Sequence, residues 1–404
     1  MTTHHAPMPA GVIALAISAF AIGSSEFIVV GILPAIAADL GISLDSAGSL
    51  VSLYALALAL GTPLLVLALS RLAPTRVLAG LIVVFLLGNL LSAFATGYTM
   101  LLAGRVVTAV AHGAFFAIGA TVAAGLVAPQ QAGRAIATMF AGLTLAMVIG
   151  VPLGSFLGNL MAWRLPFLAV ALLAAVGLGA MLRWLPGQLP QGGAGKASAQ
   201  LAALASPAIL SMMAVTVLGF GASFAAFTFI TPILTDISGF SAATASALLV
   251  VFGAATFIGN LVGGRLVTRH GWARTLAGML VGLALAQALV ALVLRAQAPM
   301  VAMLFVWGLF AFGLGPPLQA AMLATAQRYS PQAVDFASSL NISAFNLGIA
   351  PGALCGSLIV ARGAMELTPW AGSAAALAAL LPLAALAARH ARPAPDAIQP
   401  VTTR

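Results

Sequence analysis

The chain has 404 residues, of which 62% are hydrophobic and only 6% are charged, against roughly 25% charged residues in an average soluble domain. So little charge cannot cover the surface of a soluble protein of this length, and we infer that most of the surface faces a lipid bilayer. The net charge of +9 does not indicate a nucleic-acid partner, because the basic residues are single and spaced, with no cluster and no interleaved aromatic residues.

The apolar residues form twelve runs that can each cross a bilayer. A hydrocarbon core about 30 Å thick takes about 20 apolar residues in a helix, and none of the runs alternates as the strands of a β-barrel do. We therefore predict an all-α integral membrane protein with twelve transmembrane helices. The first six spans are 11–34, 46–69, 77–97, 99–124, 134–158 and 164–185. The last six are 208–235, 242–265, 274–295, 299–326, 334–360 and 368–388.

A short polar segment separates the two sets of six spans. The chain is accordingly divided into a bundle 1–185, a linker 186–206, a second bundle 207–388 and a tail 389–404. The linker contains Pro186, Pro190, Gly192, Gly193 and Gly195, and we expect a flexible, cytoplasmic surface segment. The tail contains three prolines and is expected to be disordered.

The basic residues predict the orientation of the spans, since loops rich in Lys and Arg stay in the cytoplasm. With the first span starting inside, the inner loops hold twelve of them, Arg71, Arg76, Arg134, Arg183, Lys196, Arg265, Arg269, Arg274, Arg328, Arg389, Arg392 and Arg404. The outer loops hold three, Arg164, Arg295 and Arg362. This bias predicts a multi-pass protein of the inner membrane with both termini in the cytoplasm.

The two halves repeat each other in sequence. A shift of 198 residues pairs Pro34 with Pro232, Gly61 with Gly259 and Arg71 with Arg269, and a shift of 202 pairs Gly150 with Gly352 and Gly154 with Gly356. Two parallel repeats of six spans predict a transporter whose substrate site lies near the bilayer midplane between the halves.

Two charged residues lie inside the predicted spans of the first half. Glu26 is about eight residues from the outer end of its span, and Arg105 about six residues from the outer end of its own, so both lie roughly 9–12 Å deep. Intramembrane charges usually face the interior and pair with one another. We therefore expect Glu26 and Arg105 to meet, the alternative being that each extends alone to the interface.

This pair has the properties of a proton switch. Burial favours the neutral form of a carboxyl group, and a nearby cation favours its charged form. His112 lies two helical turns beyond Arg105 on the same face. It would either relay protons or be a neutral histidine hydrogen-bonded across helices, and the sequence leaves both interpretations open.

Span 5 contains Gly150, Pro152 and Gly154. Glycines four apart allow close contact between helices, and Pro152 is expected to kink the helix because it removes a backbone hydrogen bond. In the second half, polar side chains at Gln319, Ser343 and Asn346 and phenylalanines at Phe224 and Phe227 could line a substrate cavity. Interhelical packing is the alternative for each, and Asn341 lies off the polar face.

These motifs resemble those of the major facilitator superfamily. Its cytoplasmic loop G-x-L-x-D-R-x-G-R is similar to the segments that contain Gly61 with Arg71 and, in the second half, Arg269, although Ser70 and Thr268 replace the usual Asp. The Arg of its R-x-x-x-G motif corresponds to Arg105. The G-x-x-x-G-P-x-x-G signature of its exporters is similar to 146–154, with Ala146 in place of the first glycine and Val151 inserted before Pro152.

The stretches Gly23–Phe27, Gly31–Pro34 and Tyr54–Ala55, with 112–116, resemble one branch of this superfamily. That branch contains twelve-span drug:proton antiporters near the bacterial sugar-efflux, arabinose-efflux and chloramphenicol-resistance proteins. The resemblance implies that Glu26, Arg105 and His112 couple protons and that Tyr54 lines the cavity with the residues of the second half. It also implies that Gly61, Arg71, Arg269, Gly150, Pro152 and Gly154 control the conformational change.

We therefore predict a monomeric, proton-coupled exporter of small drug-like or sugar-like molecules that works by alternating access. The proton gradient is the expected driving force, without a cofactor or bound metal, and no nucleotide-binding P-loop or catalytic nucleophile indicates an enzyme. A proton-independent facilitator or importer of sugars or nucleosides is the alternative within transport. A membrane sensor that does not transport is the alternative outside it.

Overall fold

The computed structural model describes residues 8–69, 72–128, 131–187 and 202–391. Within them, twelve helical segments are long and apolar enough to cross a membrane, which confirms the predicted all-α, twelve-span architecture. Helices dominate because a backbone in lipid must satisfy its own hydrogen bonds. Proline occupies the first turn of α3, α7, α9 and α17, where its missing N–H has no helical partner to lose.

The helices of the first half are α1 (Ala10–Leu40), α2 (Leu44–Leu69), α3 (Pro74–Ala93), α4 (Tyr98–Gly125), α5 (Ala132–Leu145), the π-helical turn η2 (Ala146–Gly150), α6 (Val151–Leu160) and α7 (Leu165–Trp184). Those of the second half are α9 (Pro207–Gly221), α10 (Phe224–Phe227), α11 (Ile230–Pro232), the π-helical turn η3 (Ile233–Ile237), α12 (Ala242–His270), α13 (Trp272–Val293), α14 (Gln297–Gly313), α15 (Gly315–Tyr329), η4 (Pro331–Ala333), α16 (Val334–Ala361), η5 (Met365–Leu367), α17 (Thr368–Ala378) and α18 (Leu380–Ala391).

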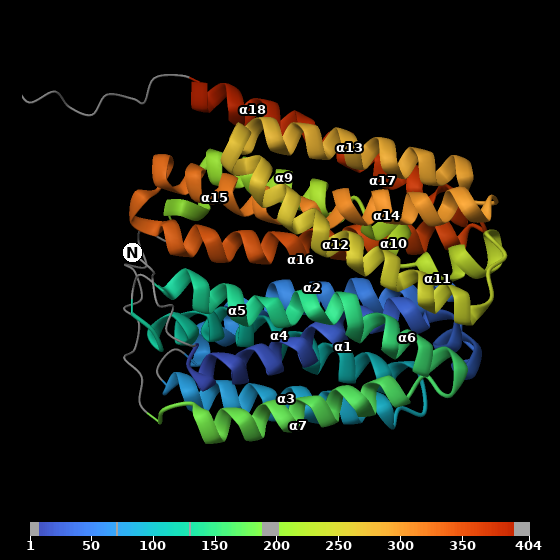
Figure 1. Ribbon diagram of the computed structural model, residues 1–404, viewed down its shortest axis with the longest axis horizontal. Coiled ribbons are helices and arrows are strands. Elements are labelled where there is room, and N and C mark those ends of the chain that lie inside the picture. The colour runs from blue at the N-terminus through green and yellow to red at the C-terminus, as the bar shows by residue number, and fades with distance from the viewer. Residues whose placement is uncertain (1–7, 70–71, 129–130, 188–201, 392–404) are drawn as a thin grey trace, which may run out of the picture.

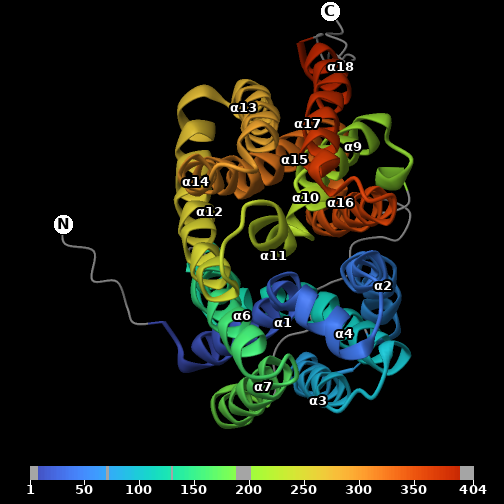
Figure 2. The same ribbon diagram turned by 90° about the vertical axis from the view of Figure 1, so that its right-hand side faces the viewer.

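The two halves form two adjacent helix bundles with their helices roughly along one direction. Figure 2 shows α1–α7 gathered on one side and α9–α18 on the other. Helix α1 begins and α18 ends at the same end of the molecule, on the left in Figure 1. The turn from α1 to α2 lies at the opposite end, which we call the α1–α2 end. Gly41 makes this turn with a φ of 61°, a left-handed conformation that glycine adopts without strain.

Several predicted spans differ from the helices in their details. The first span does not end at Pro34, because α1 continues to Leu40 with this proline inside it. The predicted span 208–235 is divided into α9, α10, α11 and η3, and the span 299–326 is divided at Leu314, just before Pro316 and Pro317. Consecutive prolines supply no N–H groups to continue the preceding helix.

Some residues of the predicted linker and tail are helical. Residues 202–204 are helical and Ala203 is completely buried, so the predicted flexible linker is wrong for that part, while 188–201 lie outside the described residues. Helix α18 continues to Ala391, so the first residues of the predicted disordered tail are helical as well. Residues 392–404 lie outside the description.

Candidate functional site

Arg105 of α4 is buried in the first half and is held on three sides. Its Nη1 donates to the carbonyl oxygen of Ser25 at 2.6 Å, and its Nη2 donates to the carbonyl oxygen of Glu26 at 3.2 Å. Its guanidinium carbon lies 3.9 Å from the centroid of the Tyr54 ring on α2, an arrangement that attracts a cation to the ring face. Arg105 is only 1% exposed, so it does not extend to the interface.

Arg105 reaches Glu26 at its backbone oxygen, and the expected ion pair between the two side chains is not formed among the described residues. The ion pairs Asp39–Arg164 and Arg295–Glu366 do not involve the site. Arg105 bonds the backbone of α1 at residues 25 and 26, whereas the half-buried Glu26 carboxylate has no hydrogen-bond partner among the described residues. Equal depth places two side chains in one layer but does not set how each helix is rotated about its axis.

Tyr54 connects Arg105 to His112. Its Oη lies 2.8 Å from His112 Nδ1, while the face of its ring carries the guanidinium. All three side chains are buried, and the His112 ring packs against Phe116 at 5.1 Å between centroids. We call these three residues the Arg105–Tyr54–His112 chain. Tyr54, predicted to line a substrate cavity, is thus a buried link between two polar groups.

A second polar contact behind Arg105 was not predicted from the sequence. Ser25 Oγ donates to Asn89 Oδ1 at 2.9 Å, and Asn89 Nδ2 donates to the carbonyl oxygen of Phe85 at 2.9 Å. Both polar side chains are fully buried. Asn89 thereby helps to fix the segment of α1 whose carbonyl groups hold Arg105. Its amide in the middle of an otherwise apolar span was a signal that could have identified it.

The polar residues of the second half do not form one cluster. Gln319 donates from Nε2 to Ser338 Oγ at 2.6 Å and accepts from Asn341 Nδ2 at 2.9 Å. Thr216 Oγ1 of α9 donates to Asn341 Oδ1 at 2.6 Å. Asn341, which the sequence placed off the polar face, is therefore the link between α9, α15 and α16.

Ser343 and Asn346 take no part in this network. Asn346 Nδ2 donates to the carbonyl oxygen of Ile342 at 3.3 Å, and its buried Oδ1 has no hydrogen-bond partner among the described residues. Ser343 is half-buried, with no hydrogen bond to another described residue. The predicted polar stripe is a set of separate groups along α16.

Phe224 and Phe227 lie in an aromatic cluster between the halves. Phe27 of α1 contacts Phe224, Phe227 and Phe312 with ring centroids 6.1–6.3 Å apart, and Phe227 stacks on Phe252 at 4.9 Å. Phe224 and Phe227 are both completely or almost completely buried. In this conformation they fill the core against Phe27, the residue that follows Glu26 in the chain, and do not present an open face to a cavity.

The predicted gating residues fall in different surroundings. Gly61 lies inside α2, where a Cβ would meet Val110 of α4, so it does not lie at the loop where the sequence placed it. Arg269 is exposed near the end of α12. Arg71 lies outside the described residues.

Gly150, Pro152 and Gly154 lie where span 5 is interrupted by η2. Pro152 has no N–H for the carbonyl group one helical turn before it, and the π-helical turn η2 ends two residues before this proline. A Cβ at Gly150 would meet Ser24 of α1, and one at Gly154 would meet Ile28. The two glycines therefore allow α1 to approach the interrupted helix closely.

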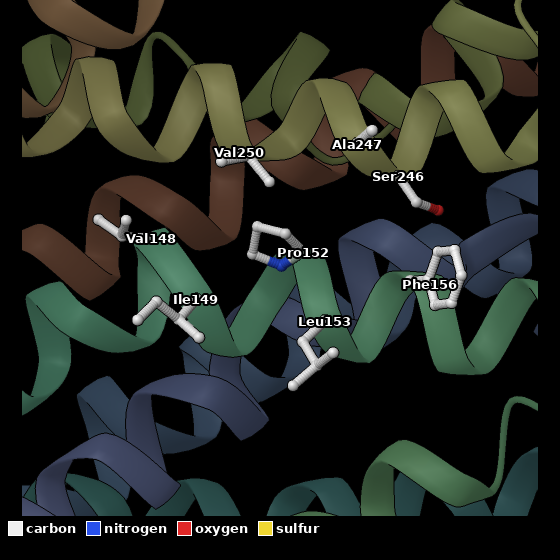
Figure 3. A pocket seen from close by; sticks show the side chains of 8 residues that line it. All are labelled: Val148, Ile149, Pro152, Leu153, Phe156, Ser246, Ala247 and Val250. Atoms are coloured by element: carbon white, nitrogen blue, oxygen red, sulfur yellow. The ribbon is translucent and has the colours of Figure 1, made fainter.

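A groove of about 380 Å³ lies where η2 and α6 meet α12 (Figure 3). It is lined by Val148, Ile149, Pro152, Leu153, Phe156, Ser246, Ala247 and Val250. Ile149, Leu153, Phe156 and Val250 are more than one-third exposed, and they belong to segments long and apolar enough to cross a membrane. The groove is therefore part of the apolar flank of the molecule, away from the Arg105–Tyr54–His112 chain.

Four hydrogen bonds between described residues join the two halves, and they gather toward the α1–α2 end. Thr231 Oγ1 donates to the carbonyl oxygens of Val30 and Gly31 at 3.1 and 3.3 Å. Ser246 Oγ lies 3.0 Å from Ser155 Oγ and accepts from Asn159 Nδ2 at 3.3 Å. Pro34 is the reason that the Val30 carbonyl group has no helical donor. We call these contacts the interhalf latch.

Comparison with known proteins gives a consistent result over nearly the whole chain. The family model described as Major Facilitator Superfamily matches residues 15–328 and 213–403. The inner membrane transport protein YdhP of Escherichia coli (strain K12) is 40% identical over 356 residues, which cover 87% of this chain and 89% of that protein. The chloramphenicol resistance protein of Streptomyces lividans is 36% identical over 378 residues, which cover 90% and 93%.

Among solved structures, a D-xylose-proton symporter superposes with a TM-score of 0.77 at 15% sequence identity, covering 92% of this chain and 96% of the symporter. An identity this low carries information about the fold alone.

Proposed function

Because this chain belongs to the major facilitator superfamily, we propose that it is a proton-driven exporter of small molecules, with Glu26 as the group that carries the proton. The family consists of transporters, and twelve apolar helices make the chain a multi-pass membrane protein. The direction of transport, the coupling ion and the substrate are the parts that we propose.

The observation that carries the proposal is the position of Glu26. It is the acid in the middle of an apolar helix, its half-buried carboxylate has no hydrogen-bond partner in the described part of the chain, and its own backbone oxygen binds the guanidinium of Arg105. Burial favours the neutral acid and the nearby cation favours the carboxylate. Small changes around Glu26 as the halves move would therefore shift it between the two forms, as proton coupling requires.

The interhalf latch supports alternating access. Its hydrogen bonds close the α1–α2 end, where Thr231 of the second half contacts α1 and Ser246 of the second half contacts α6. The bias of basic loop residues supports placing the opposite end in the cytoplasm, in the inner membrane of a bacterium. Transport would then require this latch to break so that the substrate and Glu26 become accessible from outside.

The aromatic cluster and the acid beside it support an amphiphilic substrate. Phe27 follows Glu26 directly and packs against the phenylalanines of the second half, so a molecule entering between the halves would meet rings and one carboxylate. The relative from Streptomyces lividans is a chloramphenicol resistance protein. We therefore propose drug-like amphiphiles before sugars as the cargo, with chloramphenicol as the first compound to test.

Export is tested in everted membrane vesicles from a drug-hypersensitive host that produces the full chain. Respiration acidifies the vesicle lumen, and we expect addition of chloramphenicol or a cationic dye to release luminal protons while the compound accumulates inside. Accumulation without proton release would indicate a proton-independent carrier. Binding without any flux would indicate a sensor, and either outcome would overturn the proposal.

A further inference from the structure

The contact between Tyr54 and His112 restricts which atoms carry protons. The Tyr54 side chain is 2% exposed, and its Oη has one hydrogen-bond partner among the described residues, His112 Nδ1. A phenol has one O–H to donate, whereas a neutral imidazole has one N–H donor and one acceptor nitrogen. The direction of this hydrogen bond therefore decides the tautomer of His112.

Only one direction of this hydrogen bond gives the buried O–H of Tyr54 an acceptor. If Nδ1 carried the proton and donated to Oη, the buried O–H of Tyr54 would have no acceptor among the described residues, and an unpaired buried donor is costly. If Tyr54 donates instead, Nδ1 is the acceptor and the single proton of a neutral His112 lies on Nε2. His112 Nε2 has no protein partner in the described part of the chain, and it is not among the buried polar atoms without partners. This nitrogen therefore keeps a small accessible surface, in a side chain that is 7% exposed.

Protonation of His112 is disfavoured by its burial and by the positive charge of Arg105 nearby. The charged groups around the Arg105–Tyr54–His112 chain are Arg105 itself and Glu26 of α1. The guanidinium of Arg105 lies 3.9 Å from the centroid of the Tyr54 ring, whose hydroxyl group contacts His112. Protonation of His112 would add a cation to this buried group and would leave the O–H of Tyr54 without its acceptor.

We propose that Tyr54 holds His112 as a neutral Nε2–H donor, and that His112 recognises an acceptor oxygen on the substrate instead of carrying the proton. Tyr54 is the positioning residue and His112 the specificity-determining one. The recognition role rests on the proposed transport function, whereas the tautomer does not. The substrates favoured are amphiphiles that carry a carbonyl, ester or ether oxygen.

The tautomer is tested by nitrogen NMR of the full chain in lipid nanodiscs with ¹⁵N-labelled histidine. The five histidines are separated by identifying His112 as the signal lost in His112→Gln. We expect a neutral Nε2–H ring that stays neutral as the pH falls from 8 to 5, and a mixture of tautomers in Tyr54→Phe. An Nδ1–H or protonated ring in the wild type, or an unchanged tautomer in Tyr54→Phe, would overturn the positioning role.

The recognition role is tested by binding two lipophilic cations to the same nanodiscs. Rhodamine 6G carries an ester oxygen, whereas tetraphenylphosphonium has no acceptor. We expect His112→Leu to weaken rhodamine 6G binding about 2- to 10-fold, the value of one neutral hydrogen bond, with little effect on tetraphenylphosphonium, and His112→Gln to restore it. Equal losses for both probes, or no rhodamine 6G binding by the wild type, would overturn the recognition role. Failure of proton-driven export would leave the NMR result unaffected, so the two proposals fail separately.

Discussion

Replacing Thr231 with valine should weaken the interhalf latch without changing the shape of the side chain. The hydroxyl of Thr231 donates across the interface to the carbonyl oxygens of Val30 and Gly31. Valine fills nearly the same volume but cannot donate. The Val30 carbonyl group, whose helical donor is missing because residue 34 is proline, would then lie between the halves without a partner.

The size of the effect follows from the cost of this orphaned group. A buried acceptor left without its donor costs about 1–3 kcal/mol, and the cost applies only while the α1–α2 end is closed. Opening this end would let water reach the carbonyl group. We therefore expect Thr231→Val to shift the equilibrium toward the open form by about 5- to 150-fold.

The shift can be measured by double electron–electron resonance in nanodiscs, with spin labels at Ala38 and Ala243 and with Cys355 replaced by alanine. Both label sites are exposed, one near the end of α1 and the other near the start of α12. The matched control is Thr228→Val, because Thr228 Oγ1 donates to the carbonyl oxygen of Phe224 within its own half. A longer distance in Thr231→Val alone supports the latch. The same distribution in both variants and the wild type would refute it.

Three further changes test the packing and the charges of the first half. A Cβ at Gly142 would meet the backbone of α1, so Gly142→Ala should lower the unfolding free energy by about 1–3 kcal/mol. The control Gly80→Ala, at a glycine with open space around it, should not lower it. Thermal unfolding in detergent compares the two variants. Arg105→Lys keeps the charge, but a lysine cannot donate to two carbonyl groups while stacking on a ring. It should lower the unfolding free energy by about 1.5–3 kcal/mol in the same assay. An unchanged melting temperature would contradict the described contacts of Arg105. Asp39→Asn removes the partly exposed ion pair with Arg164 and should cost only about 0.2–1 kcal/mol, a loss that high salt should reduce; a larger, salt-independent loss would contradict this view.

Much of the architecture could be predicted because apolar length and loop charge depend on composition along the chain. The depth of Glu26 and Arg105 followed from counting residues, and Arg105 indeed reaches the backbone of residue 26. Which atoms of the two residues come into contact could not be predicted, because the rotation of α1 and α4 about their axes depends on how their whole surfaces pack. The arginine therefore bonds carbonyl oxygens instead of the carboxylate.

Contacts between distant segments were the second limit. Proline at position 34 suggested the end of a helix, but α1 continues, and a threonine about 200 residues away donates to the carbonyl group that this proline leaves free. Likewise, Asn341 was set aside because it lies off a polar stripe within α16, yet its partners Thr216 and Gln319 belong to other helices. Periodicity within one helix does not report which neighbours surround it.

The central claim is that Glu26 carries the coupled proton, and it is tested most directly with purified protein in liposomes under an imposed pH gradient. Uptake of the exported compound and the accompanying proton flux are measured together for the wild type, Glu26→Gln and the control Glu366→Gln, which changes an exposed acid paired with Arg295. We predict that the wild type and Glu366→Gln couple the two fluxes, whereas Glu26→Gln binds the compound but neither uses nor dissipates the gradient. Full proton-coupled transport by Glu26→Gln would contradict the account.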